Sequence, residues 1–204
     1  MPKLLHIQSS PNLMSSVTRK LSSDFVAKWT ETHANVSVEV LDLAAEALPH
    51  FGMDNMAAMM LPPDQQSPAM QAASALSNKL ITQLENADIV VIGAPMYNFT
   101  VCTQLKAWFD HVTIAGRTFQ YTAPGVAKGL LFGKKVFVIE ARGGDYSDPP
   151  FSAFDFQEPL LRMMLMFIGL FDVSFIRAEG LRQKEDEAPA ILRQAEGVIA
   201  RMAA

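Results

Sequence analysis

Residues 90–110 read VVIGAPMYNFTVCTQLKAWFD, and this stretch decides the fold. Residues 88–94 form a nearly continuous apolar run, which predicts a central parallel strand covered on both faces. From residue 104 the apolar side chains return at helical spacing, so a helix is predicted over residues 104–116, with Gly116 as its C-terminal stop. Between the two lies Met96-Tyr97-Asn98-Phe99, an unusually apolar and aromatic loop at the mouth of a strand.

The alternation of strand and helix continues along the whole chain. Further strands are predicted over residues 3–8, 36–43, 135–141 and 172–178, and further helices over residues 16–33, 69–86, 155–169 and 185–204. Residues 44–68 are expected to be an irregular excursion, and residues 117–131 a hairpin-like one. Strands alternating with helices predict an α/β fold with a doubly wound five-stranded parallel sheet, helices on both faces, and a single domain over residues 1–204.

Composition excludes several classes of protein. The chain has 204 residues, half of them hydrophobic, and a net charge of -4, which suits one domain without a nucleic-acid partner. A single cysteine, Cys102, rules out an internal disulfide and predicts a reducing compartment. The longest apolar segment, residues 163–171, is far short of the ~20 residues that span a bilayer, and the N-terminus lacks a signal-peptide pattern. We therefore expect a soluble cytoplasmic protein with no membrane partner.

The strand order cannot be derived from alternation, but the flavodoxin-like order 2-1-3-4-5 is compatible with five strands. Its ligand crevice would lie outside the carboxyl ends of strands 1 and 3. After strand 1, Ser10, Ser16 and Thr18 surround a helix N-terminus, where free N–H groups suit a phosphate. An ordinary helix cap would explain the same residues. No G-x-G-x-x-G occurs, which favours a phosphate monoester over a dinucleotide pyrophosphate.

Two further loops at strand ends could bind a planar ring. Residues 96–99 offer Met and aromatic surface and the Asn98 amide, although such aromatics more often pack against a neighbouring element. Arg142-Gly143-Gly144 permits close backbone approach, but a plain turn is the alternative. Each signal is weak alone, and three of them at adjacent strand ends of one sheet are stronger evidence for a ligand site.

These motifs resemble one known family. APMYNF followed by TQLKAWFD, the Ser-rich loop, TFQYT and GKKVFVIEARGG resemble the FMN-dependent NADH:quinone oxidoreductases, also called FMN-dependent azoreductases. The similarity runs from about Leu4 to MFIGLFDVSFIRAEG and so covers almost the whole chain. The resemblance implies a flavodoxin-like homodimer with one FMN per subunit and NADH as electron donor. It implies two-electron ping-pong transfer to quinones and azo compounds, with nitroaromatic compounds as further acceptors.

The resemblance also assigns site residues. By matching motif, the FMN contacts are Ser10, Ser16, Val17, Thr18, Met96, Tyr97, Asn98, Phe99, Ala141, Arg142, Gly143 and Gly144. The acceptor pocket is hypothesised to use Asn98, Phe99, Phe119 and Tyr121 with aromatic residues of the partner subunit. Family members often have Ser where this chain has Ala141, and the phosphate loop reads Ser-Val-Thr rather than Ser-x-Ser. The role of the Arg142 side chain stays open.

The expected chemistry belongs to the cofactor, so no side chain is assigned a catalytic role. Backbone donors of Gly143 and Gly144 would stabilise negative charge near N1 and O2 of the reduced ring. No metal site is expected, because the four histidines lack ligand-like spacing. The helix around residues 159–171 is apolar nearly all round, so it needs cover on more than one side. Burial within the monomer is one explanation, and the resemblance implies burial in a homodimer instead.

The sequence argues against two rival functions and leaves two others open. A receiver domain would need acidic residues after strand 1, where this chain has Gln8-Ser9-Ser10. A cysteine phosphatase would need an Arg six positions after Cys102, where this chain has Trp108. A flavodoxin-like electron carrier would not need the two excursions, which look like walls of a substrate pocket. A nucleotide-binding regulator would bind without turning over NADH.

Overall fold

The computed structural model describes residues 1–204, and its centre is a parallel β-sheet. The five long strands are β1 (Lys3–Gln8), β2 (Ser37–Asp42), β3 (Ile89–Tyr97), β7 (Lys135–Ala141) and β8 (Asp172–Ala178). They lie in the order β2-β1-β3-β7-β8, which confirms the flavodoxin-like order 2-1-3-4-5. In register, Leu4 of β1 pairs with Ile89 of β3, and Ile89 pairs with Lys135 of β7. The carboxyl ends of the three central strands therefore share one edge of the sheet.

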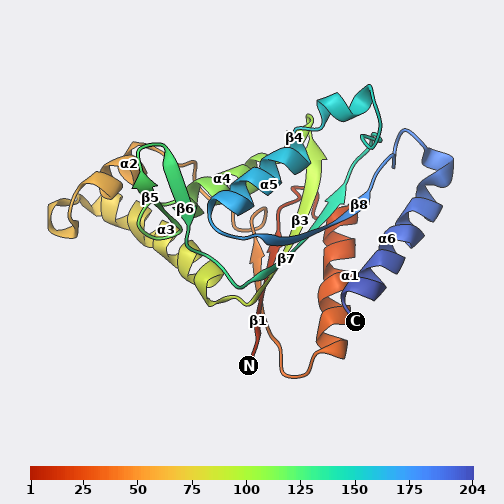
Figure 1. The fold of residues 1–204 in the computed structure, drawn as a ribbon, viewed down its shortest axis with the longest axis horizontal. Helices are drawn as coiled ribbons and strands as arrows, with labels where there is room; N and C mark the ends of the chain where they lie inside the picture. The colour runs from red at the N-terminus through yellow and green to blue at the C-terminus, as the bar shows by residue number, and fades with distance from the viewer.

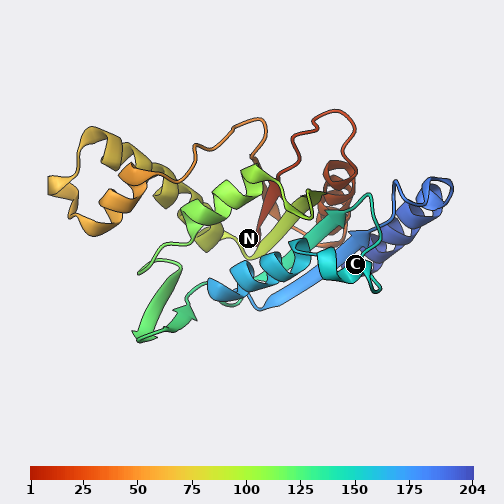
Figure 2. The same cartoon turned by 90° about the horizontal axis from the view of Figure 1, so that it is seen from above.

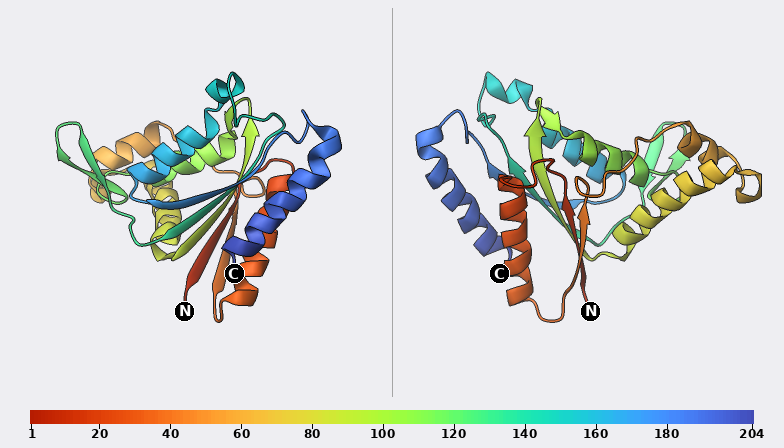
Figure 3. Two further views of the ribbon diagram at one scale, coloured as in Figure 1. Left: turned by 45° about the vertical axis from the view of Figure 1, so that its right-hand side comes forward. Right: turned by 180° about the vertical axis from the view of Figure 1, so that it is seen from behind.

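Helices cover both faces of the sheet. One face carries α1 (Val17–Thr32) and α6 (Ala188–Met202), and the other carries α3 (Pro68–Asn86), α4 (Thr103–Val112) and α5 (Gln157–Phe167). Figure 3 shows α1 and α6 side by side on one side of the sheet. Alternate residues of each strand feed the two cores: Val136 and Val138 of β7 pack toward α5, whereas Phe137 and Ile139 pack toward α1.

The excursion at residues 44–68 is more regular than expected. It contains the helix α2 (Met53–Met60) and the short 3-10 helix η1 (Pro63–Gln65), so the chain has six α-helices rather than five. The stretch 53–60 has good helix formers and no proline, and Pro62 and Pro63 end the helical run. Figure 2 shows α2 and the start of α3 extending beyond the sheet.

Helix ends depend on caps that the periodicity did not reveal. α4 ends at Val112, and Gly116 lies beyond it with φ +81°, so Gly116 is not the helix stop. α5 begins at Gln157 because the Asp155 carboxylate accepts the N–H groups of Gln157 and Glu158. α6 starts at Ala188, after the 3-10 helix η3 (Glu185–Glu187), with a proline in its first turn.

The aromatic stretch 96–99 is a β-hairpin rather than an open loop. β3 runs through Tyr97, and β4 (Thr100–Val101) turns back antiparallel, with Tyr97 opposite Thr100. The two turn residues, Asn98 and Phe99, have φ of 47° and 69°. Two positive φ values in a two-residue turn match the right-handed twist of the strands.

A second hairpin is formed by β5 (Phe119–Ala123) and β6 (Val126–Gly129), as predicted. It lies beside the C-terminal end of α5, far from the carboxyl ends of the central strands (Figure 1). Another short 3-10 helix, η2 (Phe151–Phe154), precedes α5. None of the helices combines the length and apolarity that crossing a bilayer would require.

Candidate functional site

A cavity of about 450 Å³ opens at the carboxyl ends of β1, β3 and β7, and we call it the strand-end cavity. Its lining residues are Ser10, Asn12, Ser15, Ser16, Val17, Thr18, Pro95, Met96, Tyr97, Ala141, Arg142, Gly143, Leu181 and Arg182. They come from the loop after β1, the end of β3, the end of β7 and the loop after β8. The position is the one where doubly wound sheets bind their ligands.

One end of the cavity is the N-terminus of α1. The Ser16 hydroxyl caps this helix by accepting the N–H of Arg19 at 3.3 Å, and it lies 3.0 Å from the Thr18 hydroxyl. The N–H groups of Val17 and Thr18 have no partner within the chain, as is usual in a first helical turn. Free N–H groups, the helix dipole and clustered hydroxyls give this end the chemistry that suits an anion.

Arg19 holds the loop after β1 in place. Its guanidinium donates to the Ser10 carbonyl at 2.8 and 3.0 Å and forms a two-point ion pair with Asp42 at 2.7 Å. Hydrogen bonds from Arg19 lower the pKa of Asp42 to about 2. Asn12 orders the same loop by accepting the N–H groups of Met14 and Ser15. The loop after β1 is therefore ordered by contacts within the chain itself.

The other end of the cavity presents backbone from the turn after β7. The carbonyl of Gly143 accepts the N–H groups of Arg182 and Gln183, and the carbonyl of Gly144 accepts that of Gly180. The N–H groups of Gly143 and Gly144 have no partner within the chain. With its carbonyls occupied and its N–H groups free, this turn can donate hydrogen bonds to the acceptor edge of a ring.

The structure brings most of the predicted cofactor residues together. Those that line the strand-end cavity are Ser10, Ser16, Val17, Thr18, Met96, Tyr97, Ala141, Arg142 and Gly143. Gly144 lies one residue beyond the lining, and Asn98 and Phe99 form the hairpin turn next to it. The Phe99 ring is half exposed and lies 6.1 Å from the ring of Phe154.

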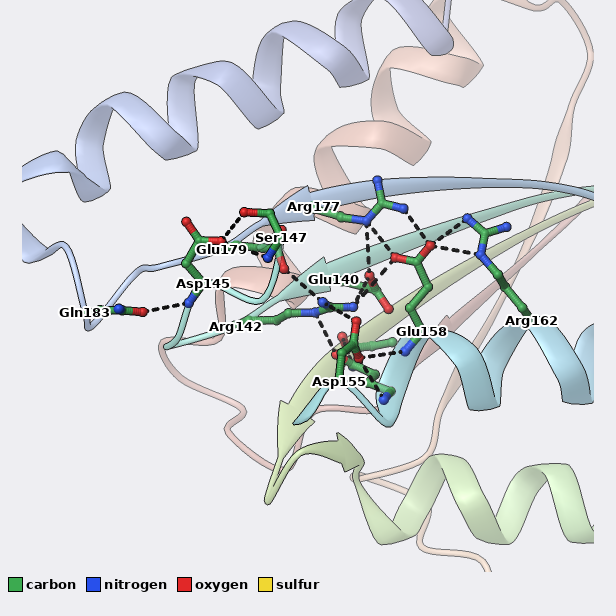
Figure 4. A network of polar contacts seen from close by, with 12 residues as sticks. Glu140, Arg142, Asp145, Ser147, Asp155, Glu158, Arg162, Arg177, Glu179 and Gln183 are labelled. Carbon is green, nitrogen blue, oxygen red and sulfur yellow. Dashed lines mark hydrogen bonds and ion pairs between the residues drawn. The ribbon is translucent and has the colours of Figure 1, made fainter. Parts of the chain in front are cut away.

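The structure answers the open question about the Arg142 side chain. It is buried on the α5 side of the sheet, where the guanidinium donates to Glu140, Asp155, Gln157 and Glu179 (Figure 4). With these partners taken, the guanidinium is not a free donor for a ligand. The part of Arg142 that can serve the cavity is its backbone.

The predicted acceptor residues are not assembled within one chain. Phe119 is buried against Phe167, with ring centroids 4.6 Å apart, and Tyr121 is exposed on the same hairpin. Neither lines the strand-end cavity, because the hairpin packs at the C-terminal end of α5 while Phe99 contacts the segment before its start. An acceptor pocket containing Asn98, Phe99, Phe119 and Tyr121 would therefore need a second subunit.

Some lining residues were not anticipated from the sequence. Leu181 and Arg182 follow β8, and their N–H groups bond to the carbonyls of Arg142 and Gly143 at 3.1 and 2.9 Å. β8 is the neighbour of β7, so the loop after it reaches the same sheet edge. The strand order 2-1-3-4-5 contains the signal for this loop, because it places the fifth strand beside the fourth. Asn12 and Ser15 belong to a loop already under consideration.

Comparisons with known proteins agree with this geometry. A family model of the flavodoxin-like fold matches residues 2–202. The chain is 46% identical to the FMN-dependent NADH:quinone oxidoreductase of Azotobacter vinelandii (strain DJ / ATCC BAA-1303), covering 100% of both chains. It is 45% identical to the protein of that name from Herminiimonas arsenicoxydans, covering 89% of this chain and 88% of that one.

Solved structures show the same similarity. An azoreductase from Bacillus anthracis str. Sterne superimposes with a TM-score of 0.93 at 30% identity, covering 100% of this chain and 99% of that one. An FMN-dependent NADH-azoreductase from Bacillus anthracis str. Ames Ancestor, solved in complex with FMN, superimposes with a TM-score of 0.86 at 26% identity, covering 99% and 100%.

The fold and the strand-end cavity together define a flavodoxin-like protein with a nucleotide-type site at the sheet edge. Within that class, the chain belongs to the family of the FMN-dependent NADH:quinone oxidoreductases. The family resemblance found in the sequence is thereby confirmed.

Proposed function

We propose that this protein is an FMN-dependent NADH:quinone oxidoreductase that also cleaves aromatic azo compounds. The observation that carries the proposal is the strand-end cavity, which has unpartnered backbone N–H groups at both of its ends. A ligand with an anionic group at one end and hydrogen-bond acceptors on a planar ring at the other would satisfy them. FMN has this arrangement.

The residues present fit FMN in charge as well as in donor type. The α1 N-terminus, with the hydroxyls of Ser10, Ser16 and Thr18, suits a single phosphate, and Arg19 holds the Ser10 carbonyl in place beside it. The glycine-rich pyrophosphate motif of dinucleotide sites is absent. A cavity of about 450 Å³ lies in the usual size range of cofactor sites.

When bound, FMN supplies the redox chemistry, taking two electrons from NADH and passing them to an acceptor. The chain binds and orients it: Met96 and Tyr97 offer apolar surface for the ring. The free N–H groups of Gly143 and Gly144 would stabilise negative charge on the ring, as donors of an oxyanion hole do. Donor and acceptor would use the same open face in turn, which gives ping-pong kinetics.

The acceptor side of the site is proposed to be completed by a homodimer. Exposed apolar side chains lie on α5 and just before it, namely Phe154, Phe156, Met163 and Met166. Packing of this face against a second copy would bury them and could bring the partner's hairpin, with Phe119 and Tyr121, near Phe99. A flat pocket between aromatic rings suits quinones, azo compounds and nitroaromatic compounds alike.

The proposal is tested on the purified protein by its visible absorbance spectrum before and after anaerobic addition of NADH, followed by acid release of the cofactor. We expect yellow protein that NADH bleaches, that a quinone or an azo dye re-oxidises, and that releases FMN. Parallel double-reciprocal plots would support alternating substrates. Colour that NADH does not bleach would indicate an electron carrier instead, and apoprotein that takes up no flavin would refute the assignment.

A substitution at the anion site tests the proposed binding mode. Thr18→Val removes a buried hydroxyl beside Ser16 and is expected to weaken FMN binding about tenfold, the order of one hydrogen bond to a charged group. Thr30→Val, an exposed position on the same helix, is the matched control and should leave FMN affinity unchanged. Equal FMN affinity in both variants would remove Thr18 from the site. Flavin fluorescence quenching on the apoprotein measures the affinity.

A further inference from the structure

Arg142 is the hub of a buried network behind the strand-end cavity. Its side chain is 2% exposed and bonds to Glu140 at 2.7 Å and to Asp155 and Glu179 at 2.8 Å. A fourth bond, at 3.1 Å, goes to the side-chain oxygen of Gln157. These partners lie on β7, on the segment before α5, at the start of α5 and after β8, so one guanidinium ties together elements that are distant in sequence (Figure 4).

Two of the elements that Arg142 joins, β7 and the loop after β8, contribute residues to the lining of the cavity at its Gly143 end. The Arg142 N–H donates to the carbonyl of Ala178 on β8 at 2.9 Å, and its carbonyl accepts the N–H of Leu181. Gln157 links Arg142 to β3, because its amide nitrogen donates to the Ala94 carbonyl of that strand at 2.9 Å. The side chain of Arg142 thus anchors the turn whose next residue, Gly143, lines the cavity.

The network has one more acid than bases. Its members are Arg142, Arg162, Arg177, Glu140, Asp155, Glu158 and Glu179. With all of them ionised, three arginines face four carboxylates and leave one buried negative charge. Removing a charge from water without a partner is costly, so one acid is expected to hold a proton.

Glu140 is the acid that fits this role. It is fully buried, and its Oε1 has no hydrogen-bond partner, while Oε2 accepts from Arg142. The charged groups that face it are Arg142 in the turn directly after β7, Arg177 on β8 at 4.0 Å, and Glu158 on α5. Burial raises the pKa of Glu140 to about 8, although Arg142 opposes the shift. Burial and the unpartnered Oε1 both favour the protonated form of Glu140.

We propose that Arg142 and Glu140 are positioning residues of the flavin site: the clamped Arg142 side chain holds the Gly143–Gly144 turn against the cofactor, and Glu140 sets the charge behind that turn. The proposal rests on the proposed function, since it needs FMN in the cavity. Glu140 is next to Ala141, which lines the cavity, but does not itself line it. When Glu140 loses its proton, the added negative charge opposes binding of FMN, whose phosphate is anionic.

The test measures the Kd of FMN on the apoprotein by flavin fluorescence quenching, at about pH 7 and about pH 9.5, on either side of the Glu140 ionisation. Glu140→Gln mimics the protonated acid, so it should bind FMN as the wild type does at the lower pH. At the higher pH the wild type should bind about tenfold more weakly than Glu140→Gln, the order expected of one unit charge acting over roughly 10 Å at an effective dielectric constant of about 20. Ionisations of FMN itself are common to all variants and cancel in the ratio.

Two further variants separate positioning from general stability. Glu85→Gln removes the acid of an exposed two-point pair with Arg117 and should follow the wild-type pH profile. Arg142→Lys keeps the charge but loses the planar fork, and it should weaken FMN binding about tenfold at both pH values. Far-UV circular dichroism shows that each variant is folded. The midpoint potential of bound FMN should differ between the wild type and Glu140→Gln more at the higher pH than at the lower one.

Parallel pH profiles of Kd in the wild type and Glu140→Gln, or unchanged affinity in folded Arg142→Lys, would overturn this inference while leaving the proposed function intact. A wild-type protein that binds no FMN at either pH would overturn both. If Glu140 had a purely structural role, Glu140→Gln would lower thermal stability, and the ratio of the wild-type Kd to the Glu140→Gln Kd would be the same at both pH values. That result would also count against positioning.

Discussion

At the scale of single residues, buried polar side chains prepare the site from beneath. His6 is 4% exposed on β1, and its Nε2 lies 2.9 Å from the Ser22 hydroxyl of α1. Gln8, two residues on, bonds to the Arg19 carbonyl and to the Ser23 hydroxyl of the same helix. These contacts fix α1 on the sheet and so hold its free N-terminal N–H groups at the edge of the cavity.

The ionisation of His6 predicts acid sensitivity. Burial, helped by the positive charge of Arg19, lowers the pKa of His6 from 6.5 to about 4. Because the unfolded chain binds this proton more readily, the free energy of unfolding should be undiminished above about pH 6.5 and fall as the pH drops toward 4. The loss is at most about 3 kcal/mol. Urea unfolding at several pH values measures it.

His6→Gln should flatten this part of the profile, even though the variant is less stable at neutral pH. His50→Gln, at an exposed position, is the matched control and should keep the wild-type slope. Asp42 titrates with a pKa of about 2, so it adds little to the slope within this window. Equal slopes in wild type and His6→Gln would show that His6 is not the group responsible.

At the scale of elements, the β5–β6 hairpin is held on α5 by close backbone contact. The N–H groups of Leu130 and Leu131 donate to the carbonyl of Ile168 at 3.1 and 2.9 Å. Gly129 and Gly169 meet at this junction, and a Cβ on Gly129 would overlap the backbone of Gly169 and Ile168. Glycine is needed here because two backbone segments of the same chain approach more closely than any side chain allows.

Gly129→Ala is therefore expected to destabilise the protein by about 3 kcal/mol, because the backbone must move to admit one methyl group. Gly125→Ala, at the tip of the same hairpin, has open space and only its positive φ of 76° to oppose it, so it should cost about 1 kcal/mol. Urea unfolding compares the two. Equal losses would mean that the hairpin yields freely at its base.

At the scale of the whole molecule, one face remains apolar. On α5, Met163 and Met166 are 45% and 55% exposed, while Leu161 and Leu165 on the opposite side are buried in the core. Phe154 and Phe156 extend the apolar surface toward the Phe99 turn. An apolar surface that reaches a binding site is typical of a functional interface.

The proposed homodimer predicts that the double variant Met163→Glu and Met166→Glu is a folded monomer by sedimentation equilibrium. Its kcat/KM for a quinone should fall at least about tenfold, because the partner's aromatic residues would be missing from the acceptor pocket. Ala27→Glu and Ala75→Glu, at exposed neutral positions on α1 and α3, provide a control with the same added negative charge. A wild-type protein that sediments as a monomer, or a monomeric variant with full activity, would contradict the prediction.

Much of this architecture follows from the sequence through local physics. The apolar runs 3–8 and 135–141 became β1 and β7 with those same bounds, because burial on both faces leaves a signal that is independent of distant partners. Helix ends were less predictable, since α5 depends on the Asp155 cap and α4 ends before Gly116. The motifs at strand ends indicated most lining residues of the cavity, and the family resemblance named its ligand.

Tertiary structure alone decided what those residues can do. The guanidinium of Arg142 is turned away from the cavity because acids from β7, from the segment before α5 and from the loop after β8 meet it there. No spacing of residues in the sequence reveals that these acids come together. Phe119 was separated from Phe99 because close glycine contact carries its hairpin to the far end of α5. The hydrophobic periodicity of a segment shows which of its faces is buried and which is exposed to water. Charge pairing and hairpin placement depend instead on which distant segments come into contact.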